Sequence, residues 1–255
     1  MKGIFDTHCH YDEFFFEKDR NEVLLTQNKN GIELIINCGS EVPSSIRSCK
    51  LAEKYPFIYA TVGVFPLEAS KVSENWLQEI EELAKKEKVV AIGEIGLDYF
   101  LSRAEKEIQK EVFIKQLALA EKLGLPVEIH DRDADEDVLS IIDKFNLKVD
   151  IHRIFSEEKY SRAFVERGYY LGIGPQITYP NSEKLINIVR EMPMKQMLLE
   201  TDCPFLPLKE FEGTRAVSSM LEDVAFKISE IRKDITPQEV IEVTKNNGKR
   251  LFGIK

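Results

Sequence analysis

Two histidines separated by one residue follow a short apolar run near the N-terminus. Along residues 6–10 the side chains of a strand would alternate, so Asp6, His8 and His10 share one face and Cys9 takes the other. Two imidazoles that project together from a strand end can bind a divalent metal ion. A strand whose histidines only cap a loop is the alternative. Asp6, on the same face, is expected to orient one of the imidazoles.

The chain contains four histidines, and all four stand at the ends of apolar runs that resemble strands. Glu94 and Asp202 end two further runs. Any one of these histidines could be a hydrogen-bonded core residue. Together, four imidazoles and two carboxylates exceed the needs of one tetrahedral site, and they suit two metals with one carboxylate bridging. We therefore expect a metal centre with these ligands: His8, His10, Glu94, His130, His152 and Asp202.

The ligand types leave the identity of the metal open. Imidazole with carboxylate suits zinc, manganese or iron, whereas magnesium prefers oxygen ligands. The predicted cofactor is thus two divalent metal ions, with Mg, Mn and Zn all possible. A pair of such ions can activate water and stabilise charge on the attacking and leaving oxygens of a hydrolysis.

Composition limits the partners and the compartment. The net charge of −9 argues against a large electropositive nucleic-acid surface, although the formal charge omits bound metals. No signal pattern and no apolar run of membrane-spanning length occur. The four cysteines form no close pair and are expected to be reduced thiols. We expect a cytoplasmic protein without a membrane partner, and a monomer, because no long apolar stripe indicates an interface.

The runs that end in these residues alternate with helical patterns along the whole chain. Eight runs have the continuous apolar character of buried parallel strands: 3–7, 32–37, 57–63, 89–94, 127–130, 149–152, 169–173 and 197–201. Segments of mixed apolar and charged residues predict helices at 22–29, 42–54, 74–86, 104–123, 135–145, 157–167, 182–191, 215–231 and 237–245.

This alternation predicts an α/β fold, a (β/α)8 TIM barrel formed as a single domain by residues 1–255. An open doubly wound sheet is the alternative, but it would normally bring a Gly-rich phosphate loop after the first strand, which this sequence lacks. In a barrel the carboxyl ends of the strands meet at one face, where the six candidate ligands would lie together.

At this point the sequence resembles the TatD family of metal-dependent hydrolases. The resemblance covers nearly the whole chain and rests on ordered segments at residues 6–10, 93–99, 129–134, 198–206 and 246–252. It implies a metal-dependent deoxyribonuclease, typically a 3′→5′ exonuclease. It also implies that one metal is held by His8, His10, Glu94 and Asp202, and a second by Glu94, His130 and His152.

The resemblance also implies catalytic and substrate-binding roles. Glu94 and Asp202 would be the catalytic carboxylates, with Asp202 accepting a proton from the attacking water. Arg132 could contact phosphate, or form only an exposed salt bridge. Tyr99 could stack on a base, or plug the barrel mouth.

Three loops depart from the family pattern. The family usually has histidines where this chain has Phe65 and Leu67, and Phe65 can neither move a proton nor hydrogen-bond to phosphate. A glycine turn is lost after Arg153, and an Asn-Glu pair is lost after Arg215, which is retained as a substrate-binding candidate. DNA or another phosphoester is therefore the expected substrate. Two alternatives stay open: a related hydrolase of a non-nucleic phosphoester, amide or lactone, and a non-catalytic metal-binding barrel.

Overall fold

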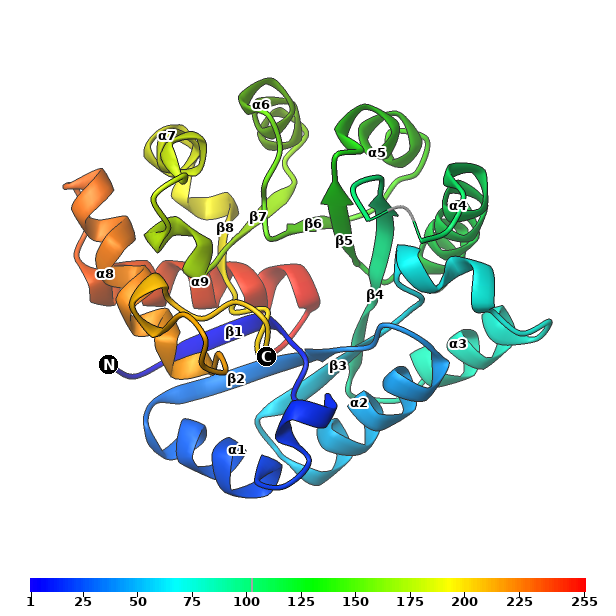
Figure 1. The fold of residues 1–255 in the computed structure, drawn as a ribbon, viewed down its shortest axis with the longest axis horizontal. Helices are drawn as coiled ribbons and strands as arrows, with labels where there is room; N and C mark the ends of the chain where they lie inside the picture. The colour runs from blue at the N-terminus through cyan, green and yellow to red at the C-terminus, as the bar shows by residue number, and fades with distance from the viewer. Residues whose placement is uncertain (102) are drawn as a thin grey trace.

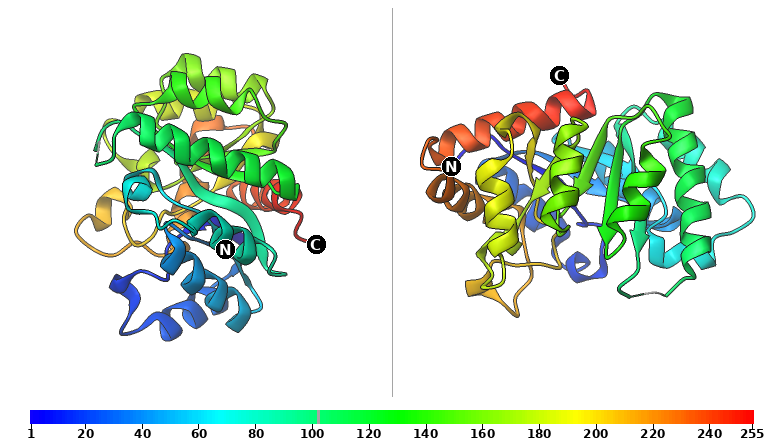
Figure 2. Two further views of the ribbon diagram at one scale, coloured as in Figure 1. Left: turned by 90° about the vertical axis from the view of Figure 1, so that its right-hand side faces the viewer. Right: turned by 90° about the horizontal axis from the view of Figure 1, so that it is seen from above.

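The computed structural model describes residues 1–101 and 103–255, and in them eight parallel strands form one sheet in sequence order (Figure 1). The strands are β1 (Ile4–Cys9), β2 (Ile32–Cys38), β3 (Ile58–Val62), β4 (Val89–Asp98), β5 (Val127–Arg132), β6 (Val149–His152), β7 (Tyr170–Ile173) and β8 (Met197–Leu199). Helices follow the strands and surround them on the outside (Figure 2). The predicted (β/α)8 barrel is confirmed.

The α-helices agree in order with the sequence prediction. They are α1 (Arg20–Lys29), α2 (Val42–Lys54), α3 (Trp76–Ala84), α4 (Lys106–Leu123), α5 (Asp135–Ile142), α6 (Glu158–Glu166), α7 (Glu183–Glu191), α8 (Leu221–Arg232) and α9 (Pro237–Phe252). Short 3-10 helices lie at Phe14–Phe16, Pro66–Lys71, Pro175–Thr178, Met194–Gln196, Lys209–Phe211 and Ser218–Met220. None of the helices in the described part of the chain is long and apolar enough to cross a membrane.

The barrel closes between its first and last strands just beyond the end of β8. Cys9 and Cys203 form an isolated parallel bridge. The amide of His10 donates to the Cys203 carbonyl at 2.7 Å, and the amide of Asp202 donates to the His8 carbonyl at 3.0 Å. The residues that close the barrel are therefore the candidate ligands themselves and their neighbours.

Several strand ends near the site differ from the prediction by about two residues, and two boundaries differ by more. β4 continues past Glu94 to Asp98, so Glu94 lies inside a strand and not at its end. The continuation requires glycine at Gly96, where φ is +139° and a Cβ atom would lie 2.0 Å from the carbonyl oxygen of His130 on β5. Helix α8 begins only at Leu221, so Arg215 lies in the preceding loop.

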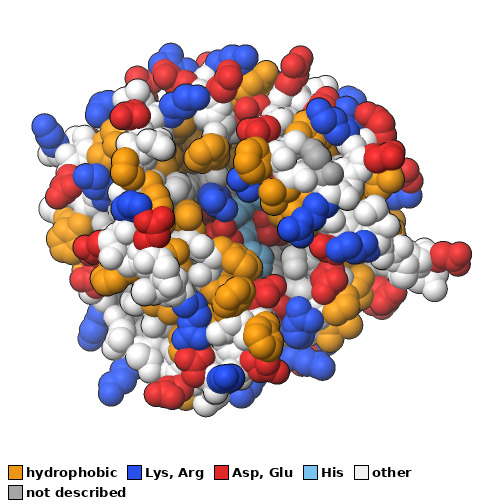
Figure 3. All heavy atoms as spheres, in the orientation of Figure 1, with side chains coloured by type: hydrophobic (Ala, Val, Ile, Leu, Met, Phe, Trp, Pro, Cys, Tyr) orange, Lys and Arg blue, Asp and Glu red, His pale blue; other side chains and the backbone are white. Residues whose placement is uncertain are grey.

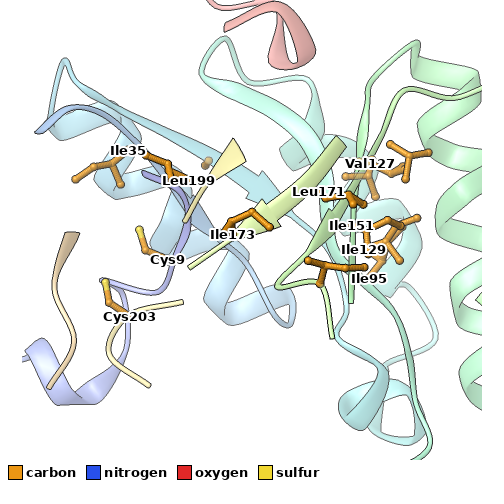
Figure 4. Close-up of a cluster of buried hydrophobic side chains, with 14 of the residues drawn as sticks. Cys9, Ile35, Ile95, Val127, Ile129, Ile151, Leu171, Ile173, Leu199 and Cys203 are labelled. Atoms are coloured by element: carbon orange, nitrogen blue, oxygen red, sulfur yellow. The ribbon is translucent and has the colours of Figure 1, made fainter. Parts of the chain in front are cut away.

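Alternating positions along the strands separate the apolar layer from the site. Val127, Ile129 and Ile151 belong to one large buried cluster (Figure 4). The residues between them point to the opposite face of their strands, which places Glu128 and His130 on the barrel interior. All four cysteines are buried and none forms a disulfide in the described residues.

Candidate metal centre

The structure brings the six predicted ligands together at the carboxyl ends of the strands. They come from β1, β4, β5, β6 and the loop after β8, and all six are buried: His8, His10, Glu94, His130, His152 and Asp202. Three overlapping groups of these side chains have ligand atoms within 4.8 Å of one another. Figure 3 shows histidine at the bottom of a hollow on this face of the molecule.

Glu94 lies between two sets of donors. Its Oε2 atom is 3.8 Å from His8 Nε2 and 3.6 Å from His10 Nε2. Its Oε1 atom is 3.1 Å from His130 Nδ1 and 3.9 Å from His152 Nε2. Each carboxylate oxygen therefore faces a different pair of imidazoles, which is the geometry that a bridging ligand needs.

The facing nitrogens of His8 and His10 fit a cation. His8 Nδ1 lies 2.9 Å from Glu128 Oε1, and His10 Nδ1 lies 3.0 Å from the Cys38 carbonyl oxygen. Because both partners accept, each Nδ1 carries a hydrogen, and each neutral imidazole has its lone pair on Nε2. The two Nε2 atoms are only 3.0 Å apart. Two lone pairs at this distance require a proton or a metal ion between them, so the donor set fits a divalent metal.

The other two imidazoles also have a carboxylate on their far side. His130 Nε2 lies 3.2 Å from Asp98 Oδ2, and His152 Nδ1 lies 3.1 Å from Glu200 Oε1. The His8 and His152 rings stack with their centroids 3.5 Å apart. Carboxylates behind metal-binding imidazoles fix ring orientation and raise ligand basicity.

The carboxylates of the centre favour bound cations. Burial alone would lower the pKa of His10, but Asp202 and Glu94 raise it to about 10. Burial would also lower the pKa of His130, but Asp98 and Glu94 raise it to about 9. Burial would raise the pKa of Asp202, yet His10 and Arg153 lower it to about 2. A metal must therefore displace protons from the imidazoles, because it binds their deprotonated nitrogens.

Asp6 does not orient an imidazole, and that prediction was wrong. Its carboxylate accepts hydrogen bonds from the Thr201 amide at 3.0 Å, the Thr201 hydroxyl at 2.7 Å and the Ser218 hydroxyl at 2.6 Å. Burial raises the pKa of Asp6 to about 6, although these hydrogen bonds act in the opposite direction and lower it. Asp6 therefore joins β1 to the chain after β8 and closes the barrel beneath the centre.

The four predicted substrate-binding residues lie in loops or at strand ends around the mouth. Phe65 presents its ring edge-on to His130, with centroids 4.7 Å apart. The Tyr99 hydroxyl donates to Asp137 at 2.7 Å, and the Arg132 guanidinium stacks on Phe100 at 4.1 Å.

Arg215 contacts the β1–α1 loop. It donates to Asp19 at 2.7 Å and to the Phe15 carbonyl at 2.7 Å. Its guanidinium lies over the Phe16 ring, 4.3 Å from the centroid. The substrate roles of Phe65, Tyr99, Arg132 and Arg215 stay predictions.

Sequence reasoning missed Arg153 as a residue of the site. It follows His152 with a φ of +46°, and its Nη1 atom donates to Asp202 Oδ2 at 3.0 Å. The positive φ lies in the left-handed region, which residues other than glycine rarely adopt.

Sequence reasoning also missed the buried carboxylates of Glu128 and Glu200. A signal for them exists, because an acidic residue stands two positions before four of the ligands, in 6–8, 128–130, 150–152 and 200–202. This spacing places acid and ligand on the same face of a strand.

Acidic residues line a cavity of about 530 Å³ beside the centre, between the loops that follow β5 and β6. Its acids include Asp131, Asp133, Asp135 and Glu157. Both carboxylate oxygens of Asp131 are buried without a hydrogen-bond partner among the described residues. Burial and the neighbouring Asp135 raise the pKa of Asp131 to about 8. This side of the mouth is unfavourable for a polyanion.

Phenylalanines occupy another side of the mouth. Phe205, 51% exposed, packs against His10 with centroids 5.7 Å apart. Phe15, 62% exposed, meets the Phe205 ring edge at 6.1 Å. Phe14, which precedes Phe15 in the sequence, is also exposed. These aromatic residues lead from a candidate ligand to the surface.

Comparison with known proteins identifies relatives over the whole length of the chain. The "Uncharacterized metal-dependent hydrolase YabD" of Bacillus subtilis is 39% identical over 254 residues, which cover 98% of this chain and 99% of that protein. The "Deoxyribonuclease TATDN3" of Homo sapiens is 28% identical over 265 residues, covering 98% and 94%. The crystal structure of YjjV, a TatD homologue from Escherichia coli, has a TM-score of 0.94 at 31% identity and covers 99% of each chain.

The family described as TatD related DNase matches residues 5–253. This range includes all six candidate ligands and every strand except the first residue of β1. The matches confirm the predicted resemblance and the prediction of a hydrolase: the chain belongs to the TatD-related DNase family.

Proposed function

We propose that this chain hydrolyses phosphodiester bonds with a pair of divalent metal ions, as a 3′→5′ DNA exonuclease. The observation that carries the proposal is the position of Glu94, whose two oxygens face two different pairs of imidazoles. In the proposal, one metal is held by His8, His10, Glu94 and Asp202, and the other by Glu94, His130 and His152. Bound divalent metals of this kind lower the pKa of a bound water and neutralise charge on phosphoryl oxygens.

Asp202 is the proposed general base. Its Oδ1 atom faces His8 Nε2 and His10 Nε2 at 3.7 and 3.6 Å, while Arg153 holds Oδ2 at 3.0 Å. Arg153 therefore fixes the orientation of this carboxylate beside the two imidazole nitrogens that would bind the metal. Acceptance of the water's proton by a positioned carboxylate contributes about 10²–10⁴-fold in rate.

A polynucleotide would enter over the aromatic side of the mouth. Exposed rings stack on unpaired bases for about 1–3 kcal/mol each, and Phe205 and Phe15 offer such rings next to His10. The cavity beside Asp131 has more acidic residues than its two lysines, Lys159 and Lys184, and this excess would repel a phosphate backbone there. The name of the Homo sapiens relative, a deoxyribonuclease, agrees with this substrate.

The test is an assay of the purified chain loaded with Mg, Mn or Zn. The substrates are single-stranded DNA labelled at the 5′ end, the same DNA labelled at the 3′ end, and a panel of phosphoesters, esters and lactones. A ladder of shortened 5′-labelled products, abolished in His130→Ala, is expected. Arg167→Ala is the control that should retain activity. Arg167 forms an exposed salt bridge with Asp143, outside the candidate metal centre. Metal binding without cleavage of DNA by the wild-type chain would contradict the proposed substrate.

A hydrolase of a small phosphoester, amide or lactone is the second candidate. The favouring observation is Phe65, which places an aromatic ring against His130 where the family usually has a histidine. Phe65→His should raise nuclease activity if the lost imidazole limits DNA cleavage. Turnover of small esters alone, with no gain in Phe65→His, would favour the second candidate.

We further propose that the protein acts as a monomer in the cytoplasm. Light scattering at micromolar concentration should give a mass near 29.4 kDa. A mass of twice this value would overturn the proposed monomer.

A further inference from the structure

Glu128 is a buried carboxylate that reaches a candidate ligand from the far side. It lies on β5, two residues before His130, and therefore points to the same interior face. Its Oε1 atom is 2.9 Å from His8 Nδ1, and neither side chain is exposed to solvent. With Glu128 accepting this hydrogen bond, His8 keeps its hydrogen on Nδ1 and presents the lone pair of Nε2 to the centre.

The remaining oxygen of Glu128 is also occupied. Oε2 accepts from the Thr61 hydroxyl at 3.2 Å and from the Cys38 thiol at 3.1 Å. Donors from β1, β2 and β3 thus hold one carboxylate that comes from β5. This network restricts Glu128 to a single orientation, and through it the ring of His8.

The backbone next to Glu94 makes room for this carboxylate. A Cβ atom at Gly93 would lie 2.7 Å from the Cβ of Glu128 and 3.0 Å from its Oε2 atom. Any larger residue at position 93 would displace Glu128. The glycine that precedes one candidate ligand therefore permits the residue that supports another.

We propose that Glu128 is a positioning residue for His8, and that Glu128 thereby sets the metal affinity of the site formed by His8, His10 and Asp202. This inference rests on the proposed dinuclear centre. Carboxylates behind metal-binding imidazoles are worth about 10–100-fold in affinity. The effect is confined to one metal, because His130 and His152 have their own carboxylate neighbours, Asp98 and Glu200.

The test compares Glu128→Gln with Asp150→Asn in the full chain. Glutamine has nearly the shape of glutamate but carries no charge, so Glu128→Gln replaces the charged acceptor of the His8 Nδ1–H by a weaker, neutral one. Asp150 is the matched control: it is equally buried, lies two residues before His152, and forms no hydrogen bond through its carboxylate among the described residues. Calorimetric titration with Mn²⁺ and Zn²⁺, with metal counting by mass spectrometry, gives the affinity of each site.

The expected result is a loss of about 10–100-fold at one site in Glu128→Gln, with the other site changed less than about threefold. Asp150→Asn should change neither site by more than that. Wild-type affinity in Glu128→Gln, or an equal loss in both variants, would overturn the proposal. If Glu128→Gln fails to fold, Thr61→Val replaces it, because this variant removes one donor to Glu128 but keeps the carboxylate. Unchanged metal affinity in Thr61→Val would then overturn the proposal.

These binding measurements separate the inference from the proposed function. A wild-type chain that binds two metals, loses one in Glu128→Gln and cleaves no phosphoester would support the positioning role and contradict the proposed activity. A wild-type chain that binds no metal would overturn both.

Discussion

The hydrogen bonds of Asp6 predict a specific pattern of destabilisation. Asp6→Ala removes the acceptor of three donors: the Thr201 amide, the Thr201 hydroxyl and the Ser218 hydroxyl. The two hydroxyls keep other partners, because Ser218 also bonds to Tyr11 at 2.7 Å and Thr201 Oγ1 accepts from the Cys203 amide at 3.2 Å. The buried Thr201 N–H loses its acceptor.

The expected magnitude follows from these contacts. An unpaired buried N–H costs about 1–3 kcal/mol, and weakening two hydroxyl bonds adds about 1 kcal/mol. Release of a buried carboxylate returns part of this, since burial already raises the pKa of Asp6. After this return we expect Asp6→Ala to lower the free energy of unfolding by about 1–3 kcal/mol. Asp6→Asn keeps an oxygen for the amide and an NH2 group for a hydroxyl, so its cost should stay below about 1 kcal/mol.

Urea denaturation of the metal-free chain measures both variants. Circular dichroism and intrinsic fluorescence should report the same transition, which tests whether a two-state treatment applies. The decisive measurement is the difference in the free energy of unfolding between the two variants. An equal cost for Asp6→Ala and Asp6→Asn, or a cost below 1 kcal/mol for both, would refute the assignment of the Thr201 N–H to Asp6.

Three further predictions follow from the same structure. Divalent metal at about 100 times its dissociation constant should raise the free energy of unfolding by about 2.7 kcal/mol, and Glu94→Gln should remove most of this gain in thermal denaturation. Gly96→Ala should give insoluble or strongly destabilised protein in expression trials, because its Cβ would lie 2.0 Å from the His130 carbonyl oxygen. The four cysteines should resist a thiol reagent at pH 8 in the native chain and react completely in denaturant. Burial raises the pKa of Cys49 to about 11, and rapid reaction of the native chain would contradict the burial of the four thiols.

The sequence predicted the elements well because their signals are local. Continuous apolar runs identify buried parallel strands, and Gly124 with a φ of +66° ends α4 as its position suggests. The start of α8 was predicted too early, since the loop before it is fixed by Arg215 and its contacts with Asp19 and the Phe15 carbonyl. Those contacts join residues almost 200 positions apart, and no local pattern reports them.

The candidate ligands were found because their types and positions at strand ends are unusual. The carboxylates behind them were not found, because burial of an acid depends on partners that only the barrel supplies. Glu128 reaches His8 on β1, Thr61 on β3 and Cys38 on β2. The single-face argument placed Asp6 beside the imidazoles, and this was wrong. The register of β1 shifts between Asp6 and Cys9, and the Asp6 carboxylate lies within 4.8 Å of the Cys9 and Cys203 sulfurs. The hydroxyls of Thr201 and Ser218 bind it there.

The barrel interior holds two groups of buried carboxylates whose pKa values are shifted in opposite directions. Asp202 and Glu94 have lowered pKa values despite burial, because histidines and Arg153 surround them. Glu200 is as deeply buried, yet its pKa is raised well above the usual range by burial and by Asp150 and other acids. The pKa values of Glu200 and Asp202, two positions apart on one segment, are thus shifted in opposite directions. Because the pKa values of Glu94 and Asp202 are lowered, these two carboxylates favour the binding of a divalent cation at their level of the barrel.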